Sequence, residues 1–179
     1  VAEKLAYVLG GHVPGWTPEN VGIRFGKTGT DATTMAVRLA RAVTVCQYVV
    51  SSGYHGWGDW SVSKTPPAWG ISRHLQFVRD FPFNDLPALE AALGERENVA
   101  AVILEQPMVD PNPGYYAAVR RLCDRAGALL IMDEVVTWPR YGLGGASERF
   151  GIEPDIVCLG KGLGNGIAIS AIDGRRDLI

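Results

Sequence analysis

Lys161 is the residue of this sequence with the clearest potential for chemistry. It follows an apolar run at 156–159 and lies in a glycine-rich stretch at 160–166. An amine that is partly desolvated after a buried strand has a lowered pKa, and its lone pair can attack a carbonyl carbon. Schiff-base chemistry is therefore possible at Lys161. A solvated lysine in a glycine-rich turn is an equally good interpretation of this stretch alone.

Asp133 is the second candidate, because it directly follows the apolar run at 128–132. A carboxylate that emerges at the end of a strand could hold the ring nitrogen of a bound heterocycle protonated. An Asp in this position is also a common helix or turn cap, and for Asp133 alone that interpretation is the better one. Glu105, at the end of the run at 99–104, is a further carboxylate of this kind. It could equally be satisfied by neighbouring backbone, and we rank it below Asp133.

Thr28, Gly29 and Thr30 directly precede an amphipathic run and could bind a phosphate. Free backbone N–H groups, hydroxyls and the positive end of a helix dipole all suit an anion. Simple helix capping is the favoured interpretation of these residues in isolation, and the G-x-x-x-x-G-K-[ST] and G-x-G-x-x-G motifs are absent at this turn. Tyr54 could stack on a flat ring and His55 could form a hydrogen bond nearby, although Tyr-His-Gly is also typical of an aromatic loop with a tight turn.

Helices are predicted between these candidates. Apolar residues at i, i+3, i+4 and i+7 predict a helix over 31–43, and the same spacing recurs over 115–126 before Gly127. Asn84 or Asp85 can cap a further helix, with Pro87 in its first turn and Gly94 at its end. The stretch 57–69 shows no clear period and predicts an irregular surface excursion.

Strands are predicted from short apolar runs. These runs lie at 45–51, 75–78, 99–104, 128–132 and 156–159, with a further possible element at 167–172. Nearly uniform apolar strands that alternate with amphipathic helices predict an α/β fold with a mainly parallel sheet sandwiched by helices, α/β/α. Ligands of such sheets bind beyond the carboxyl ends of the strands. All the candidate residues fall at such ends or at the start of a following helix, so we expect them to converge.

Composition excludes several classes of protein. The 179 residues include 17 Lys and Arg against 19 Asp and Glu, so neither a nucleic-acid partner nor an anionic membrane is expected. The longest apolar run, at 99–104, is far shorter than the roughly 20 residues of a membrane span. Cys46, Cys123 and Cys158 are widely spaced in apolar sequence, which favours reduced thiols over disulfides or a metal site. With no export signal visible, we expect a cytoplasmic protein.

Taken in order, these residues resemble the class III, fold-type I aminotransferases that use pyridoxal 5'-phosphate (PLP), most closely the branch with glutamate-1-semialdehyde aminomutase. The resemblance extends from about Ile23 to the C-terminus. It rests on several spaced motifs: residues 27–32 with 37–42, Gly53-Tyr54-His55-Gly56-Trp57, residues 103–105, the segment ALLIMDEVVT at 128–137, and residues 154–162. The resemblance implies the large cofactor-binding domain of fold-type I PLP enzymes.

The resemblance also implies a role for each candidate. Lys161 would carry PLP as a Schiff base and move the substrate proton, and Asp133 would pair with the ring nitrogen. Glu105 would lie toward the substrate. The remaining residues would bind the cofactor: Gly29 and Thr30 with Thr28 beside them at the phosphate, Tyr54 and Val135 on opposite ring faces, and His55 in support of the Tyr54 loop.

The sequence departs from the family pattern at several positions. Lys27 stands where the family often has Asn, and Gln106 separates Glu105 from Pro107 where the family usually has Glu-Pro. Trp138-Pro139 replaces the common Gly-Phe. These changes fall in the loops near the expected substrate side of the site.

The resemblance implies PLP-dependent amino-group transfer, by an aminotransferase or an aminomutase, on a small amino-acid or amino-sugar-like substrate. We expect residues 1–179 to form the large domain of a homodimer, with 1–22 partly a flanking segment and the small C-terminal domain of the family absent. The alternative is a truncated, non-catalytic fragment that folds and binds PLP or dimerises without turnover. A nucleotide-binding α/β domain is disfavoured, because its phosphate fingerprint is missing.

Overall fold

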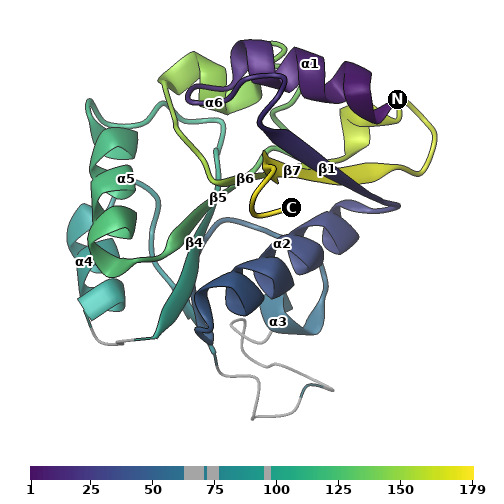
Figure 1. Cartoon of the computed structure of the whole chain (residues 1–179). Coiled ribbons are helices and arrows are strands. Elements are labelled where there is room, and N and C mark those ends of the chain that lie inside the picture. Colours follow the sequence, from purple (N-terminus) through teal and green to yellow (C-terminus); the bar gives the residue numbers. More distant parts are fainter. Residues whose placement is uncertain (63–70, 72–76, 95–97) are drawn as a thin grey trace.

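The computed structural model describes residues 1–62, 71, 77–94 and 98–179, which form a layered fold around one sheet (Figure 1). The sheet has the strand order β1-β7-β6-β5-β4-β2-β3. Along the chain its strands are β1 (Val21–Gly26), β2 (Tyr48–Ser52), β3 (Val78–Asp80), β4 (Val99–Glu105), β5 (Leu129–Asp133), β6 (Ile156–Leu159) and β7 (Ser170–Arg175). Neighbouring strands from β6 to β3 pair in parallel, whereas β7 is antiparallel to β1 and β6. The predicted mainly parallel sheet is confirmed.

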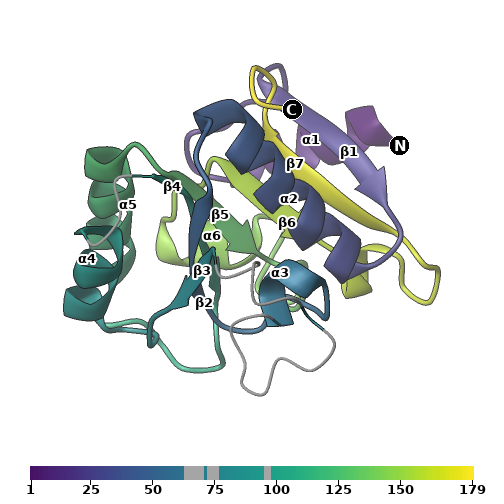
Figure 2. The same cartoon turned by 90° about the horizontal axis from the view of Figure 1, so that it is seen from below.

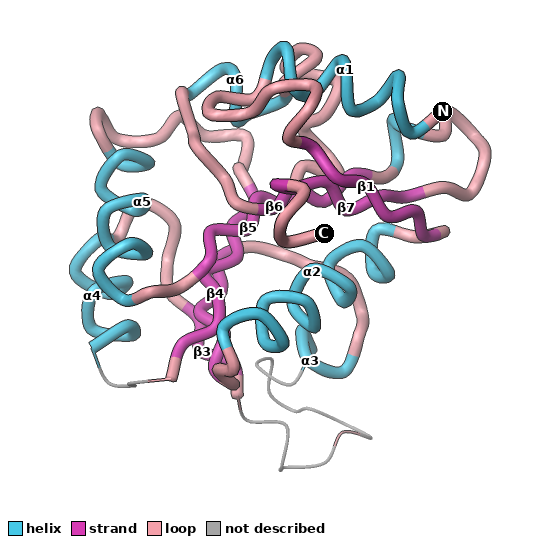
Figure 3. Tube along the Cα trace, in the orientation of Figure 1, coloured by secondary structure: helices cyan, strands magenta, loops and turns pink. Residues whose placement is uncertain are grey.

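Helices cover both faces of the sheet. The helices are α1 (Ala2–His12), α2 (Gly29–Thr44), α3 (Asp59–Val62), α4 (Leu86–Gly94), α5 (Tyr115–Ala126) and α6 (Gly145–Phe150). In Figure 2, α2 lies in front of the strands with α3 near its start, and Figure 3 shows the other helices across the sheet. Strand side chains point alternately to the two faces of the sheet. Leu104 and Met132 accordingly pack with α1, α4 and α5, whereas Ile103 and Ile131 pack with α2. The α/β/α prediction is confirmed.

The predicted helices are confirmed with small changes at their ends. The helix predicted over 31–43 is α2, and the one predicted over 115–126 is α5, which ends at Gly127 with a left-handed φ of 64°. Asp85 precedes α4 and caps it, since Asp85 Oδ1 accepts the Ala88 N–H at 2.9 Å. Residues 59–62 of the stretch expected to be irregular form α3, and residues 63–69 lie outside the described part of the chain.

The strand predictions need more correction. The strand predicted from residue 45 starts only at Tyr48, because α2 runs to Thr44 and Val45 takes a left-handed φ of 56° at its end. The strand predicted over 75–78 is β3, which starts at Val78, and residues 75 and 76 lie outside the described residues. The element predicted over 167–172 is β7, which begins at Ser170 and runs antiparallel. Three elements, α1, α6 and β1, were not predicted from the sequence. Of these, α1 packs its Leu5 and Leu9 into the core.

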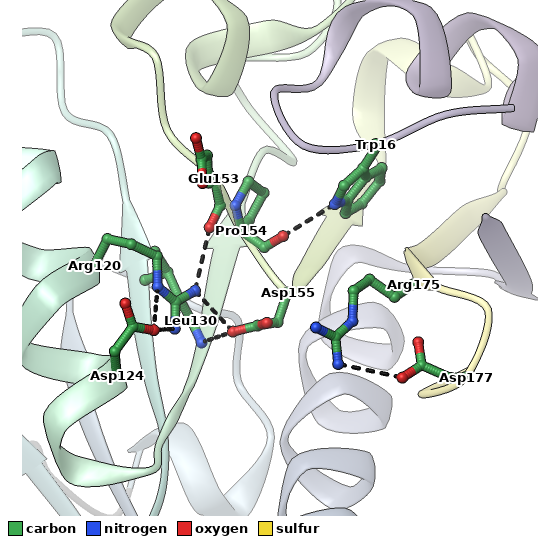
Figure 4. A network of polar contacts seen from close by, with 9 residues as sticks. All are labelled: Trp16, Arg120, Asp124, Leu130, Glu153, Pro154, Asp155, Arg175 and Asp177. Carbon is green, nitrogen blue, oxygen red and sulfur yellow. Dashed lines mark hydrogen bonds and ion pairs between the residues drawn. The ribbon is translucent and has the colours of Figure 1, made fainter.

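A polar network fixes the amino ends of β5 and β6, at the opposite edge of the sheet from Asp133 (Figure 4). Asp155, just before β6, accepts hydrogen bonds at 2.8 Å from both the Leu130 N–H and Arg120 Nη1. The Asp155 N–H in turn donates to the Leu130 carbonyl at 2.9 Å. Trp16 Nε1 donates to the Pro154 carbonyl at 3.0 Å and ties the segment after α1 to the same place. These contacts hold β6 in register with β5.

In the described part of the chain, no helix combines the length and apolar character that a bilayer span requires. Cys46, Cys123 and Cys158 are free thiols, and burial raises the pKa of the Cys123 thiol to about 12. Cys123 is therefore protonated and unreactive at neutral pH.

Asp173 on β7 is a buried acid whose carboxylate makes no hydrogen bond with the described residues. It is fully buried, and neither of its carboxylate oxygens has a hydrogen-bond partner among the described residues. Burial raises its pKa well above the usual value. The folded protein therefore retains the Asp173 proton to a higher pH than the unfolded chain, which ionises this residue above about pH 4.

This difference predicts a pH-dependent loss of stability. Below about pH 4 both states bind the proton and Asp173 costs nothing electrostatically. As pH rises toward the folded-state pKa, the parent should lose about 1.4 kcal/mol of unfolding free energy per pH unit relative to Asp173→Asn. Urea denaturation at pH 5, 6 and 7 measures the difference. Asp177→Asn, an exposed acid on the same part of the chain, is the control, and parallel pH profiles for parent and Asp173→Asn would contradict the assignment.

Candidate functional site

All the candidate residues except Thr28 line a cavity of about 240 Å³ beyond the carboxyl ends of the parallel strands. Its lining residues are Gly29, Thr30, Thr33, Tyr54, His55, Gly56, Glu105, Asp133, Val135, Val136 and Lys161. A larger groove, of about 550 Å³, lies between α4 and α5, and its lining contains none of the candidates. The residues to which the sequence assigned possible chemistry therefore lie at the smaller cavity, not at the groove.

The first turn of α2 supplies the N–H groups of the cavity. Thr28 does not line the cavity; its Oγ1 accepts the Asp31 N–H at 3.1 Å, and Asp31 Oδ2 accepts the Thr28 N–H at 2.8 Å. For the Thr28 hydroxyl, the capping interpretation is therefore the one that the structure favours. Gly29 and Thr30 do line the cavity, and as first-turn residues their N–H groups have no acceptor within the helix. This turn can bind an anion.

Gly29 also sets how closely α2 approaches the sheet. A Cβ at this position would lie 2.9 Å from Val135 Cγ1, closer than side-chain carbons approach one another. Val135 itself is buried and follows β5 by two residues. Only glycine therefore lets the anion-binding turn rest on Val135, beside Asp133.

Asp133 and His55 form a buried pair at the floor of the cavity. His55 Nδ1 lies 2.8 Å from Asp133 Oδ2, and Asp133 Oδ1 accepts the Val135 N–H at 3.1 Å. Both side chains are almost completely buried. One carboxylate oxygen thus acts as the turn cap that the sequence suggested, and the other pairs with His55. These two hydrogen bonds replace part of the hydration that the carboxylate loses on burial.

The surroundings of His55 fix its position. Thr33 Oγ1 donates to the His55 carbonyl at 2.7 Å, and the Trp60 ring stacks on the imidazole with 6.0 Å between ring centroids. His55 Nε2 is buried without a partner among the described residues. Nδ1 is accordingly the nitrogen through which His55 acts on Asp133.

Lys161 lies on the cavity wall and is exposed. Of the two interpretations that the sequence left open, the described residues favour a solvated lysine in a glycine-rich turn over a partly desolvated amine. The reason is local, since the glycines around it have no side chains to cover the amine. Its φ of 35° places Lys161 in the left-handed region, which costs a residue with a Cβ on the order of 1 kcal/mol.

Tyr54 and Glu105 complete the side of the cavity next to β2 and β4. The Tyr54 side chain is 66% exposed, so its ring is free to face a ligand. Glu105 Oε2 accepts the Tyr54 N–H at 2.9 Å. This is the backbone contact that the sequence analysis left open as an alternative for Glu105.

Several residues of the site and its supports were not predicted from the sequence. Thr33 and Val136 line the cavity. Thr33 could have been found, because it is one helical turn after Thr30 and shares its face. Glu134 is buried and accepts the N–H groups of Ala146 and Ser147 at 2.9 and 2.8 Å, as well as the Thr137 hydroxyl. Burial raises the pKa of Glu134, these hydrogen bonds oppose that shift, and the residue holds the start of α6.

Gln106 and Trp138-Pro139, which depart from the family pattern, both have distinctive local structure. Gln106 is buried, and its Nε2 donates at 2.7 Å to the carbonyls of Pro107 and Val109. It therefore shapes the loop after β4 from within. The Trp138-Pro139 peptide bond is cis. Nothing in the structure explains Lys27, which is exposed.

The topology and the cavity define an α/β/α domain that presents an anion-binding turn, a buried acid and an amine at one sheet edge. The chain belongs to the class III aminotransferase family, whose model, described as aminotransferase class-III, matches residues 1–179. The resemblance stated from the motifs is therefore confirmed.

Individual relatives support this membership. The chain is 43% identical over 177 residues to glutamate-1-semialdehyde 2,1-aminomutase of Thermomicrobium roseum, with 88% of this chain and 41% of the relative covered. It is 40% identical over 160 residues to 3-aminobutyryl-CoA aminotransferase of Cloacimonas acidaminovorans, with 84% and 38% covered.

A similar solved structure is the glutamate-1-semialdehyde aminomutase of Pseudomonas aeruginosa PAO1 in complex with PMP. The TM-score is 0.81 at 30% sequence identity, and the match covers 99% of this chain and 41% of that chain. This chain spans about two fifths of the length of the relatives and structures that it matches.

The left-handed backbone of Lys161 leads to a stability prediction. Lys161→Gly should be more stable than Lys161→Ala by about 0.5–1 kcal/mol, because glycine removes the Cβ strain, partly offset by its greater entropy in the unfolded chain. Chemical denaturation of the two variants measures the difference. The control pair is Lys4→Gly and Lys4→Ala within α1, where alanine should be the more stable. The same order at both positions would contradict the left-handed conformation of Lys161.

Proposed function

We propose that this protein binds PLP and carries out PLP-dependent amino-group transfer, as an aminotransferase or a glutamate-1-semialdehyde-aminomutase-like enzyme. The observation that carries the proposal is the convergence of the α2 turn, the Asp133–His55 pair and Lys161 on one cavity of about 240 Å³. These groups come from four separate parts of the chain. The related P. aeruginosa structure, which contains PMP, adds support.

The donor set fits PLP group by group. The N–H groups of Gly29 and Thr30, which have no acceptor within the helix, suit a phosphate at the positive end of a 16-residue helix. Tyr54 and Val135 offer an aromatic and an aliphatic surface for the two faces of a flat ring. Asp133 offers a charged acceptor for a protonated ring nitrogen. The cavity is smaller than the roughly 300–1,000 Å³ of drug-sized pockets, as suits a compact ligand.

Lys161 and Asp133 divide the chemistry in this proposal. Bound PLP supplies an electron sink for the bonding electrons of the substrate α-carbon. Lys161 Nζ would hold PLP covalently and would take up and return a proton at the substrate α-carbon. Asp133, oriented by His55, keeps the proton on the ring nitrogen. Thr28 acts indirectly, because it caps α2, whose first two residues, Gly29 and Thr30, would bind the phosphate.

The substrate and the assembly are further parts of the proposal. We infer a small amino-acid or amino-sugar-like substrate, and the two relatives named above, an aminomutase and an aminotransferase, leave both reactions open. A homodimer is supported by large exposed apolar side chains, among them Trp57 at 75% and Ile167 at 77%, which follow the Tyr54 loop and the Lys161 turn along the chain. A cytoplasmic location rests on the three free thiols.

A second candidate is a fragment that binds PLP without turnover. The exposure of Lys161 and Tyr54 favours it, since neither the amine nor the ring is shielded from water by the described residues. Amino transfer from an amino donor to a keto acid separates the two candidates. Turnover that is lost in Lys161→Ala supports the enzyme, whereas cofactor binding without turnover supports the fragment.

Attachment of PLP at Lys161 is directly testable. After addition of PLP and reduction with borohydride, peptide mass spectrometry should find the pyridoxyl group on Lys161, because only this lysine lines the cavity among the described residues. Lys161→Ala should remove the adduct. Lys27, exposed and next to the α2 turn, is the internal control for random modification, and a dominant adduct there would overturn the assignment.

The role of Asp133 predicts a loss of cofactor affinity. Asp133→Asn should raise the Kd for PLP by about tenfold or more, because a hydrogen bond to a charged group contributes about 1.5–3 kcal/mol. Absorbance titration with PLP gives the Kd. Asp173→Asn, at a buried acid that does not line the cavity, should keep the Kd of the parent. Melting curves of Asp133→Asn control for lost stability, and an unchanged Kd in Asp133→Asn would contradict the role of Asp133.

A further inference from the structure

The loop that carries Tyr54 starts beside Glu105 because of strand register. β2 and β4 are neighbouring parallel strands, and Ser52 at the end of β2 pairs with Leu104. Gly53 follows Ser52, and Glu105 follows Leu104. These two residues therefore lie side by side at the carboxyl ends of the strands. The contact is fixed by the sheet rather than by the loop.

Gly53 allows this contact to be unusually close. Its φ is +104°, and a Cβ at this position would lie 2.7 Å from Glu105 Cβ and 3.1 Å from Glu105 Oε2. A side chain would therefore be excluded both by the backbone conformation and by the carboxylate. Glycine lets the Glu105 carboxylate reach past residue 53 to the following amide.

Glu105 uses this access to hold the Tyr54 backbone. Its Oε2 accepts the Tyr54 N–H at 2.9 Å, a bond to a charged acceptor, which is stronger than a bond between neutral groups. On the other side of the loop, Thr33 Oγ1 donates to the His55 carbonyl at 2.7 Å. Tyr54 is thus held between β4 and α2 by its backbone and that of its neighbour.

The Tyr54 ring has little other support. Its side chain is 66% exposed, so packing against the described residues does not determine where the ring lies. The ring position therefore depends on the backbone contacts on either side of it. Among the described residues, Glu105 Oε2 is the acceptor for the Tyr54 N–H itself.

We propose that Glu105 is a positioning residue, which fixes the Tyr54 ring over the cofactor cavity by holding the Tyr54 amide. This inference rests on the proposed function for the identity of the ligand, and it replaces the substrate contact that the sequence suggested for Glu105. The required group is an acceptor oxygen at the place of Oε2. A glutamine therefore substitutes for Glu105, whereas an alanine does not.

Hydrogen exchange of the Tyr54 amide tests the contact without any cofactor. In the purified apo-protein, Glu105→Ala should speed this exchange about tenfold, as expected for loss of a bond to a charged acceptor. Glu105→Gln should retain most of the protection. Asp110→Ala, in the loop after the same strand, should leave it unchanged, and melting curves of the apo-proteins control for general loss of structure.

Titration with PLP tests the consequence for the ligand. Glu105→Ala should weaken PLP binding several-fold and reduce the circular dichroism of bound PLP, while Glu105→Gln and Asp110→Ala should match the parent. Unchanged Tyr54 exchange in Glu105→Ala would overturn the proposal, as would faster exchange with unchanged PLP binding. Weaker PLP binding in Glu105→Gln with Tyr54 protection intact would make the carboxylate itself a ligand contact, which also overturns it.

The two proposals fail in different ways. If the parent protein binds no PLP, the proposed function fails, while the exchange comparison still decides whether Glu105 holds Tyr54. If PLP binds and Lys161 carries it, but Glu105→Ala behaves as the parent, only the positioning role fails.

Discussion

The parallel register of β4, β5 and β6 is the constraint on which the site depends. It pairs Glu105 with Asp133 and Asp133 with Cys158, three residues before Lys161. Side chains alternate along a strand, so a slip of β5 by one residue would turn Asp133 away from His55 and toward the other face of the sheet. The Asp155 contacts at the far end of β5 and β6 oppose such a slip. The site is therefore secured partly by residues that never approach it.

The buried pair Asp133–His55 is the costliest feature of the site. Removing a carboxylate from water is unfavourable unless hydrogen bonds replace the lost hydration. Here the His55 ring and the Val135 N–H supply those bonds, and Trp60 and Thr33 hold His55 in place. Such an acid gains most when a positive charge enters the cavity, which is the property that a protonated ring nitrogen would use.

Sequence patterns predicted the parts of the structure that follow from periodicity and from strand ends. The helices around 31–43 and 115–126 and the strands at 99–104, 128–132 and 156–159 were predicted almost to the residue, and the candidates at their ends, Thr28 excepted, line one cavity. The antiparallel direction of β7 was not predictable, because a short apolar run carries no direction. The sequence left the solvation of Lys161 open between two interpretations, because it depends on the absence of covering side chains rather than on the preceding strand. The capping role of Thr28 was stated but could not be separated from phosphate binding without the geometry of Asp31.

In the proposed function, separate parts of the chain form one site for a flat, phosphorylated ring. A crystal structure of the protein grown with PLP would show this site. We expect electron density for the phosphate at the N–H groups of Gly29 and Thr30, with the ring between Tyr54 and Val135 and its nitrogen at Asp133. Density for PLP in the groove between α4 and α5, or a ring in the cavity whose nitrogen points away from Asp133, would contradict it.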